Sequence, residues 1–166
     1  EKGVRMGMDI FGGEIEEELE EISGRKIIGT VEKVKLIGKD GKEIEVEAKI
    51  DTGAGFSSID TELAKELGFE QTATMFEELH PGYEKLKALS PEERKNIFSN
   101  VPDLADTAII HSSHGTTYRP MVSIEMIMEG LRIQTKTSII NRSHLNYRII
   151  IGKKNLGKFL IDTLRR

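Results

Sequence analysis

The residues with the clearest chemical potential are Asp51-Thr52-Gly53-Ala54, which follow a segment of alternating apolar and charged residues. A carboxylate on a tight loop can hold a water molecule, and a neighbouring glycine lets backbone amides approach and orient that water. These are the requirements of a general base. The tripeptide Asp-Thr-Gly by itself is more typical of a strand-ending turn with a side-chain-to-backbone hydrogen bond, so its meaning depends on its surroundings.

The segment that leads into Asp51 has the pattern of a β-hairpin. Apolar residues recur over residues 28–36, and over residues 43–50 they alternate with glutamate and lysine. Asp40-Gly41 lies between the two segments, and this dipeptide favours a tight turn with positive φ. The alternation predicts a hairpin with one buried and one solvated face, which places Asp51 at the end of its second strand.

Helices are expected in two further regions. Ile15, Leu19 and Ile22 form one apolar stripe on an acidic segment, so residues 1–24 are predicted to be an N-terminal acidic helical extension. Residues 71–105 contain three prolines and the sequence Ser90-Pro91-Glu92-Glu93, which has the cap, proline and acidic first turn of a helix start. We interpret residues 71–105 as a helical insertion in a β-protein.

The remainder of the chain has β-patterning. β-patterning predicts strands over 108–111, 116–118, 122–128 and 131–139, and the apolar run before Gly152 predicts a short strand over 147–151 that is buried on both faces. The first two form a hairpin around Ser112-Ser113-His114-Gly115. A short helix is expected over Asn155–Leu160, and Ser58 or Asp60 can cap another after the Asp-Thr-Gly loop.

A second motif gives the first its context. Ile149-Ile150-Ile151-Gly152, with Lys153–Leu156 after it, follows Asp51 by about one hundred residues, and a glycine-tipped hairpin lies between them. In this order the motifs resemble the retropepsin family of single-domain aspartic proteases, in which an apolar-apolar-Gly motif and a short helix close the fold and the hairpin is the flap.

The sequence is also similar to prokaryotic retropepsin-like proteins labelled ATP-dependent zinc proteases. The similarity is carried by Lys49–Ala54 with Ser57-Ser58, then Arg119–Val122, Asn141-Arg142 and Tyr147-Arg148, and it covers roughly residues 25–163. It implies a mainly β fold, a closed retropepsin-like barrel of six or seven strands. Residues 25–166 would form this domain.

The resemblance also implies a mechanism. Aspartic proteolysis needs two carboxylates that share a proton, and the chain has one Asp-Thr-Gly, so a working site requires a homodimer with Asp51 from each chain on the two-fold axis. Thr52 would hydrogen-bond across that axis and Gly53 would allow close backbone approach. Water would hydrolyse the peptide bond without a covalent intermediate, metal or nucleotide cofactor.

Substrate contacts are expected from the loop, the flap and two arginines. These residues are Ala54, His111, Ser112, Ser113, His114, Gly115, Arg119 and Arg142. Arg119 and Arg142 suit an acidic substrate or a peptide carboxylate, since a guanidinium binds carboxylates bidentately, but they can equally pair with surface glutamates or brace a dimer. For Arg148 we favour an ion pair with a surface glutamate.

Composition excludes several other classes. The 166 residues contain no cysteine, which removes disulfide scaffolds, thiolate metal sites and cysteine nucleophiles. The net charge of −4 argues against a nucleic-acid partner. Neither an apolar run of membrane-spanning length nor a secretory leader is present, so we expect a soluble, cytoplasmic protein without a membrane partner.

Three alternatives to the protease remain to be weighed. The same fold could serve as a catalytically silent binding or regulatory module. A zinc hydrolase built from His111 and His114 with His144 or Asp51 is less favoured, because a catalytic zinc normally needs three converging ligands and no His-Glu-x-x-His motif is present. Asp-Thr-Gly-Ala-Gly also resembles the phosphate loops of actin-like ATPases, but 166 residues cannot supply their two large lobes.

Overall fold

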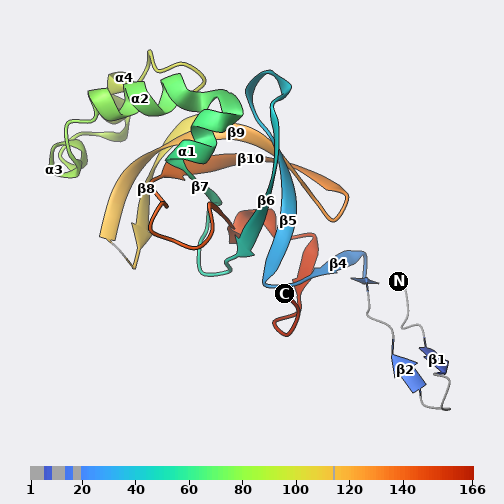
Figure 1. Cartoon of the computed structure of the whole chain (residues 1–166). Coiled ribbons are helices and arrows are strands. Elements are labelled where there is room, and N and C mark those ends of the chain that lie inside the picture. The colour runs from blue at the N-terminus through green and yellow to red at the C-terminus, as the bar shows by residue number, and fades with distance from the viewer. Residues whose placement is uncertain (1–5, 9–13, 17–19, 114) are drawn as a thin grey trace.

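The main body of the protein is a β-barrel. The computed structural model describes residues 6–8, 14–16, 20–113 and 115–166. One sheet contains β5 (Val31–Ile37), β6 (Glu43–Ile50), β7 (Ser58–Asp60), β8 (Asp106–Ser112), β9 (Gly115–Met128), β10 (Leu131–Ile140) and β11 (Ile149–Ile151). Its order is β10-β7-β11-β6-β5-β9-β8, and pairing of β9 with β10 closes the first six strands into a barrel (Figure 1). The predicted fold class is confirmed.

The predicted β5–β6 hairpin is present, and its turn lies at Asp40-Gly41. Val34 lies opposite Val46, and Asp40 and Gly41 both have positive φ, of 56° and 75°. The glutamates of β6 are exposed, whereas Ala48 and Ile50 are buried in the barrel. The apolar side chains on one face of β6 therefore point into the barrel. Asp51 is the residue that directly follows β6.

A second, smaller sheet corrects the prediction at the N-terminal side. β3 (Glu21–Ile22), β4 (Arg25–Ile28) and β12 (Phe159–Ile161) form a three-stranded sheet, and β1 (Met6–Met8) pairs with β2 (Glu14–Glu16). The helix expected over residues 13–22 is therefore not formed where the chain is described. Ser23 and Gly24, both with positive φ, make a tight turn that pairs Glu21–Ile22 with the next strand.

The expected helix over Asn155–Leu160 is also corrected. A 3₁₀ helix covers Lys153–Asn155, and β12 then pairs in parallel with β4. Leu156 and Phe159 are buried as predicted, but they reach the core from a turn and a strand. Gly157 separates the two, and a glycine is a poor continuation for a short helix.

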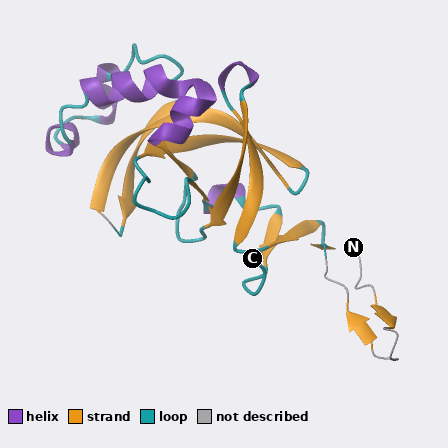
Figure 2. Cartoon of the chain, in the orientation of Figure 1, coloured by secondary structure: helices purple, strands orange, loops and turns teal. Residues whose placement is uncertain are grey.

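The helices predicted within residues 71–105 are present. They follow α1 (Thr61–Ala64) and a π-helical segment over Lys65–Phe69, and they comprise α2 (Glu70–Leu79), α3 (Tyr83–Lys87) and α4 (Pro91–Ile97). The capping box at Ser90 and Glu93 is formed. The helices gather on one side of the barrel (Figure 2). There Phe76, Phe98 and Tyr118 form a second buried core between the helices and β9.

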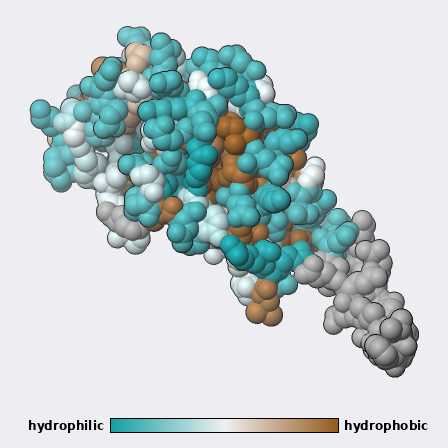
Figure 3. All heavy atoms as spheres, viewed as in Figure 1, coloured by the Kyte–Doolittle hydropathy of each residue, from teal (hydrophilic) through white to brown (hydrophobic). Residues whose placement is uncertain are grey.

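The surface seen in Figure 3 is largely hydrophilic, with an apolar area near the middle of this face. Half-buried side chains such as Ile44 and Val46 pack from the strands against the barrel core. In the part of the chain that the structure describes, no helix combines the length and apolarity needed to cross a membrane.

Candidate active site

The Asp-Thr-Gly loop is held against the strand β11. The Asp51 amide donates to the Ile151 carbonyl (2.9 Å), which continues the parallel pairing of β6 with β11. The Asp51 carboxylate is half-buried, and its Oδ1 accepts the Gly53 amide (2.9 Å). Because Thr52 and Gly53 are exposed, the structure presents an oriented carboxylate on an open loop.

The second half of the loop is fixed by the Gly152 segment. The amides of Lys153 and Lys154 donate to the carbonyls of Ala54 (2.7 Å) and Gly55 (3.1 Å). A Cβ atom on Gly152 would lie 2.4 Å from the Phe56 carbonyl, so only glycine allows this approach. The two motifs that are separated in sequence therefore meet at one site.

Three hydrogen-bonded polar side chains, of which only Ser57 is fully buried, hold the loop in place. The Ser57 hydroxyl accepts from the Gly152 amide (3.0 Å) and donates to Asn155 Oδ1 (2.7 Å). Asn155 Oδ1 also accepts from the Thr135 hydroxyl (3.0 Å). Strand β10, the Asp51 loop and the 3₁₀ helix are thereby joined. Asn155 was not among the predicted site residues, since only its tertiary contacts reveal this function.

The flap hairpin is formed by β8 and β9. His111 Nδ1 and Thr116 Oγ1 are 2.9 Å apart, and the Ser112 hydroxyl donates to the Gly115 carbonyl (3.2 Å). His111, Ser112, Ser113 and Gly115, four of the residues expected to contact substrate, are exposed. His114, the remaining predicted flap residue, lies outside the described residues.

Arg142 is the predicted substrate residue with the clearest link to Asp51. Burial lowers the pKa of its guanidinium, and the negative charges of Asp51 and Asp60 oppose that shift. Its Nε donates to the Tyr147 carbonyl (3.0 Å), and its amide donates to Asp60 Oδ1 (2.6 Å). Arg142 is thus a half-buried cation that is positioned within the electrostatic reach of the Asp51 carboxylate.

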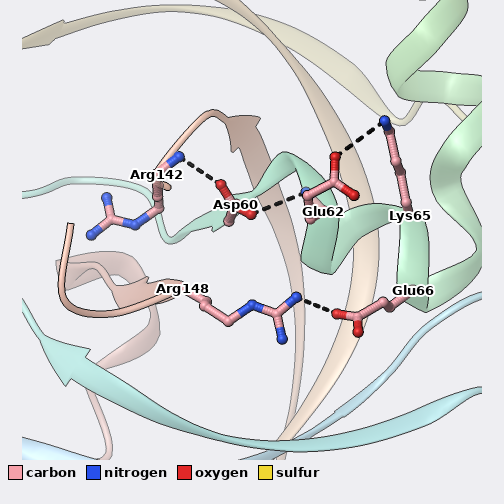
Figure 4. A network of polar contacts seen from close by, with 6 residues as sticks. All are labelled: Asp60, Glu62, Lys65, Glu66, Arg142 and Arg148. Carbon is pink, nitrogen blue, oxygen red and sulfur yellow. Dashed lines mark hydrogen bonds and ion pairs between the residues drawn. The ribbon is translucent and has the colours of Figure 1, made fainter. Parts of the chain in front are cut away.

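Asp60 connects this arginine to the helices. Its carboxylate is buried, and it accepts the amides of both Arg142 and Glu62, so it caps α1 and fixes the 141–148 loop at the same time (Figure 4). The Asp60 amide donates to the Arg148 carbonyl (2.8 Å). The sequence identified Asp60 only as a possible cap, because its second partner lies 82 residues away.

Arg119 lies deeper than Arg142. It is 8% exposed; its Nε donates to Thr117 Oγ1 (2.7 Å), and its Nη1 lies 3.3 Å from Ser58 Oγ and 3.4 Å from Ser138 Oγ. Burial and then the charge of Arg142 lower its pKa. Among the described residues, no carboxylate lies within ion-pair distance of Arg119.

Two further predictions concern an ion pair of Arg148 and a histidine metal site. The Arg148 guanidinium pairs with Glu66, as the favoured interpretation expected (Figure 4). No group of three or more histidine and carboxylate side chains suited to a metal ion occurs within the described residues, a set that leaves out His114.

The chain matches the model of one known protein family. Residues 27–163 match the model of the RimB-like family, described as retropepsin-like aspartic endopeptidase RimB. No curated protein is significantly similar to the chain.

Two solved structures show distant similarity. A Legionella pneumophila protein of unknown function (DUF785) is 14% identical, with 83% of this chain and 93% of that chain covered and a TM-score of 0.43. The simian foamy virus protease is 10% identical, with 76% and 90% covered and a TM-score of 0.38. The family match spans most of the chain, including both motifs that meet at Asp51, so the protein belongs to the RimB-like family of retropepsin-like aspartic endopeptidases.

Proposed function

We propose that this protein is an aspartic endopeptidase that works as a homodimer with one Asp51 from each chain. The observation that carries the proposal is the fixed Asp51 carboxylate, which accepts the Gly53 amide on a loop pinned to the Gly152 segment. One chain supplies one such carboxylate, whereas aspartic proteolysis needs two that share a proton. A two-fold axis beside the exposed Thr52 and Gly53 would supply the second.

The chemistry assigns different tasks to the two carboxylates. The ionised Asp51 removes a proton from water, and the protonated Asp51 of the partner polarises the scissile carbonyl. Water then adds to the carbonyl carbon, and the carbon–nitrogen bond breaks as the amine takes up a proton. Thr52 hydrogen-bonds across the axis and keeps the two loops in register, while Ala54 lines the site.

Substrate binding falls to the flap and the arginines. His111, Ser112, Ser113, His114 and Gly115 close over the peptide. Arg142 binds an acidic group of the peptide or its terminal carboxylate, because a guanidinium binds carboxylates bidentately and no carboxylate of the described residues forms an ion pair with Arg142. Arg119, buried without a carboxylate partner among the described residues, adds positive potential behind Arg142.

The first test is cleavage of a diverse peptide pool at several pH values, read by mass spectrometry. Wild type is compared with Asp51→Asn and with the control Asp40→Asn, which changes a carboxylate at the exposed β5–β6 turn where asparagine tolerates the positive φ. We expect Asp51→Asn to lose at least about 10²-fold in rate. Activity retained in Asp51→Asn would refute the proposal. Cleavage lost on adding a chelator would favour a metal site at His111 instead.

Mixing tests whether the site is shared. If wild-type and Asp51→Asn chains exchange freely at equal concentrations, about one quarter of the dimers keep two carboxylates. The rate per total wild-type chain should then fall to about half. A rate that stays proportional to wild-type chains would show that each chain works alone. Sedimentation of both proteins at the assay concentration confirms that the substitution leaves dimerisation intact.

A further inference from the structure

Building on the proposed peptidase function, we propose that the helical insertion braces the base of the flap, so that only the part of the flap beyond Ile109 and Tyr118 moves when the flap closes. The insertion is the segment of residues 71–105, which contains α3, α4 and most of α2. Tyr118 is then a positioning residue, because its contacts determine where the flap begins to bend.

The flap is a two-stranded ribbon where it leaves the barrel. β8 pairs with β9 along its whole length. β9 gains a second neighbour at Met121, which lies opposite Ser138 of β10. Among the strand pairings of the described residues, positions 115–120 of β9 have β8 as their single partner. Because a two-stranded hairpin is only marginally stable in water, the flap needs packing against another element to hold a defined position.

The insertion supplies this packing at one level of the ribbon. Ile109 of β8 lies opposite Tyr118 of β9, and both pack in the second core that Phe76 and Phe98 form. The Tyr118 side chain is buried, and its ring stacks on Phe98 with the centroids 5.7 Å apart. The hydroxyls of Tyr118 and Thr107 are 2.6 Å apart. Tyr118 is thus joined both to the insertion and, across the ribbon, to β8.

Burial along both strands changes close to the same level. On β9, positions 118–122 are buried and Gly115 is exposed. On β8, positions 106–110 are half-buried and the last two residues are exposed. The part beyond the Ile109–Tyr118 pair, which we call the outer flap, consists of residues 110–113 and 115–117. It is therefore the part that can bend without disturbing the second core.

The insertion can act as a brace because the barrel holds it at both ends. Leu67, which precedes α2, is fully buried in the barrel core. The Thr72 hydroxyl donates to the Pro102 carbonyl (2.7 Å) and joins the beginning of the insertion to its end. Asp103 pairs with Lys39 (2.8 Å) in the turn between β5 and β6. The aromatic cluster therefore connects the flap base to an anchored element.

Amide hydrogen exchange of the ¹⁵N-labelled full chain tests the brace without depending on catalysis. In wild type, the slowest amides of the flap base (residues 106–109, 118 and 119) should exchange at least about tenfold more slowly than the slowest amides of the outer flap. Tyr118→Phe removes only the hydroxyl that meets Thr107, and it should speed exchange in the flap base about fivefold, the effect of one net hydrogen bond. Equal exchange in the two parts of the wild-type flap would overturn the inference.

Two matched variants show whether the effect is local. Ile28 is fully buried in the barrel core, so Ile28→Val should destabilise the barrel and leave exchange in the flap base unchanged. Thr107→Val removes the same hydroxyl contact from its other side. The double variant should therefore exchange no faster than the faster of the two single variants. An equal effect of Ile28→Val on the flap base, or additive effects of the two flap substitutions, would also overturn the inference.

The peptide pool separates this inference from the proposed function. If both hold, Tyr118→Phe should raise KM for the cleaved peptides about fivefold and leave kcat within about twofold, because a longer mobile flap loses more conformational freedom when it closes. The expected exchange pattern without any peptide cleavage by wild type would refute the peptidase function, while the brace on the hairpin stands. A wild-type KM in Tyr118→Phe, with cleavage intact, would overturn the positioning role and leave the peptidase function standing.

Discussion

The substitution Gly152→Ala tests how the Asp51 loop is built. Gly152 has φ of −85°, which any residue adopts, so the substitution causes no backbone strain. The added Cβ would instead lie 2.4 Å from the Phe56 carbonyl carbon and oxygen and 2.9 Å from the Gly55 oxygen, where ordinary contacts begin at 3.4 Å. The backbone of the Asp51 loop would have to move by about 1 Å (3.4 minus 2.4 Å).

The expected loss of stability in Gly152→Ala depends on the displacement of the loop backbone. Overpacking typically costs about 1–3 kcal/mol, and a clash with backbone rather than with a flexible side chain favours the upper end. We expect the free energy of unfolding to fall by about 3 kcal/mol and Tm by about 6–12 °C. Because a 1 Å displacement of catalytic groups can cost 10²-fold, peptidase activity should fall by about that factor even below the lowered Tm.

Thermal unfolding at one protein concentration measures the change, with Gly157→Ala as the matched control. A Cβ on Gly157 would meet no atom within 4 Å, and Gly157 lies in the same segment. This control should stay within about 2 °C of wild type. If Gly152→Ala is as stable as Gly157→Ala, the close approach does not hold the loop and the reasoning fails.

Four further substitutions have defined outcomes. Thr137→Val should raise the free energy of unfolding by about 1 kcal/mol in urea, because the buried Thr137 Oγ1 has no hydrogen-bond partner among the described residues. Arg119→Met should change stability by less than about 1 kcal/mol while weakening peptide binding, because no carboxylate of the described residues pairs with this cation. Ser90→Ala should cost about 1 kcal/mol through loss of the capping box. Burial raises the pKa of Glu32, against the Gly29 hydrogen bond that lowers it, so Glu32→Gln should raise Tm at pH 7.

The pH dependence of Glu32→Gln has a definite sign. A carboxyl whose pKa is raised on folding destabilises the protein once it ionises, so the gain should disappear as the pH falls through the raised pKa towards the ordinary value of 4.5. A gain that persists at low pH would contradict this origin. For the other three, the contradicting results are a less stable Thr137→Val, a strongly destabilised Arg119→Met and a Ser90→Ala as stable as wild type.

Local patterns predicted the parts of the fold that depend on neighbouring residues. The alternation over residues 43–50 places Ala48 and Ile50 inside, and Asp40-Gly41 forms the turn, because both depend on residues next to them in sequence. The helix predicted for the N-terminal segment was wrong, because contacts beyond the local pattern determine its structure. Its apolar stripe fits a helix, but the Ser23-Gly24 turn and the partner strand β4 stabilise a strand instead.

The candidate site also contains some residues that the sequence predicted and others that it could not predict. The motifs at Asp51 and Gly152 are visible in the sequence, and the structure brings them into contact. Asp60 and Asn155 have functions that arise only when β7, β10 and the 141–148 loop meet, so residue type and spacing could not reveal them. A pocket of about 640 Å³, lined by residues of α2 and residues 116–120 of β9, depends on how the insertion packs against that strand, and no pattern within either segment predicts it.

The hydrogen bonds that shape the Asp51 loop have a consequence for the protein during synthesis. The loop is held by the Ile151 carbonyl and by the amides of Lys153 and Lys154, and the first of these residues leaves the ribosome 100 residues after Asp51 (51 to 151). A nascent chain that already contains Asp-Thr-Gly therefore lacks the backbone contacts that hold the Asp51 loop in place. Translation of the Gly152 segment therefore sets the earliest moment at which the Asp51 loop can take its final form.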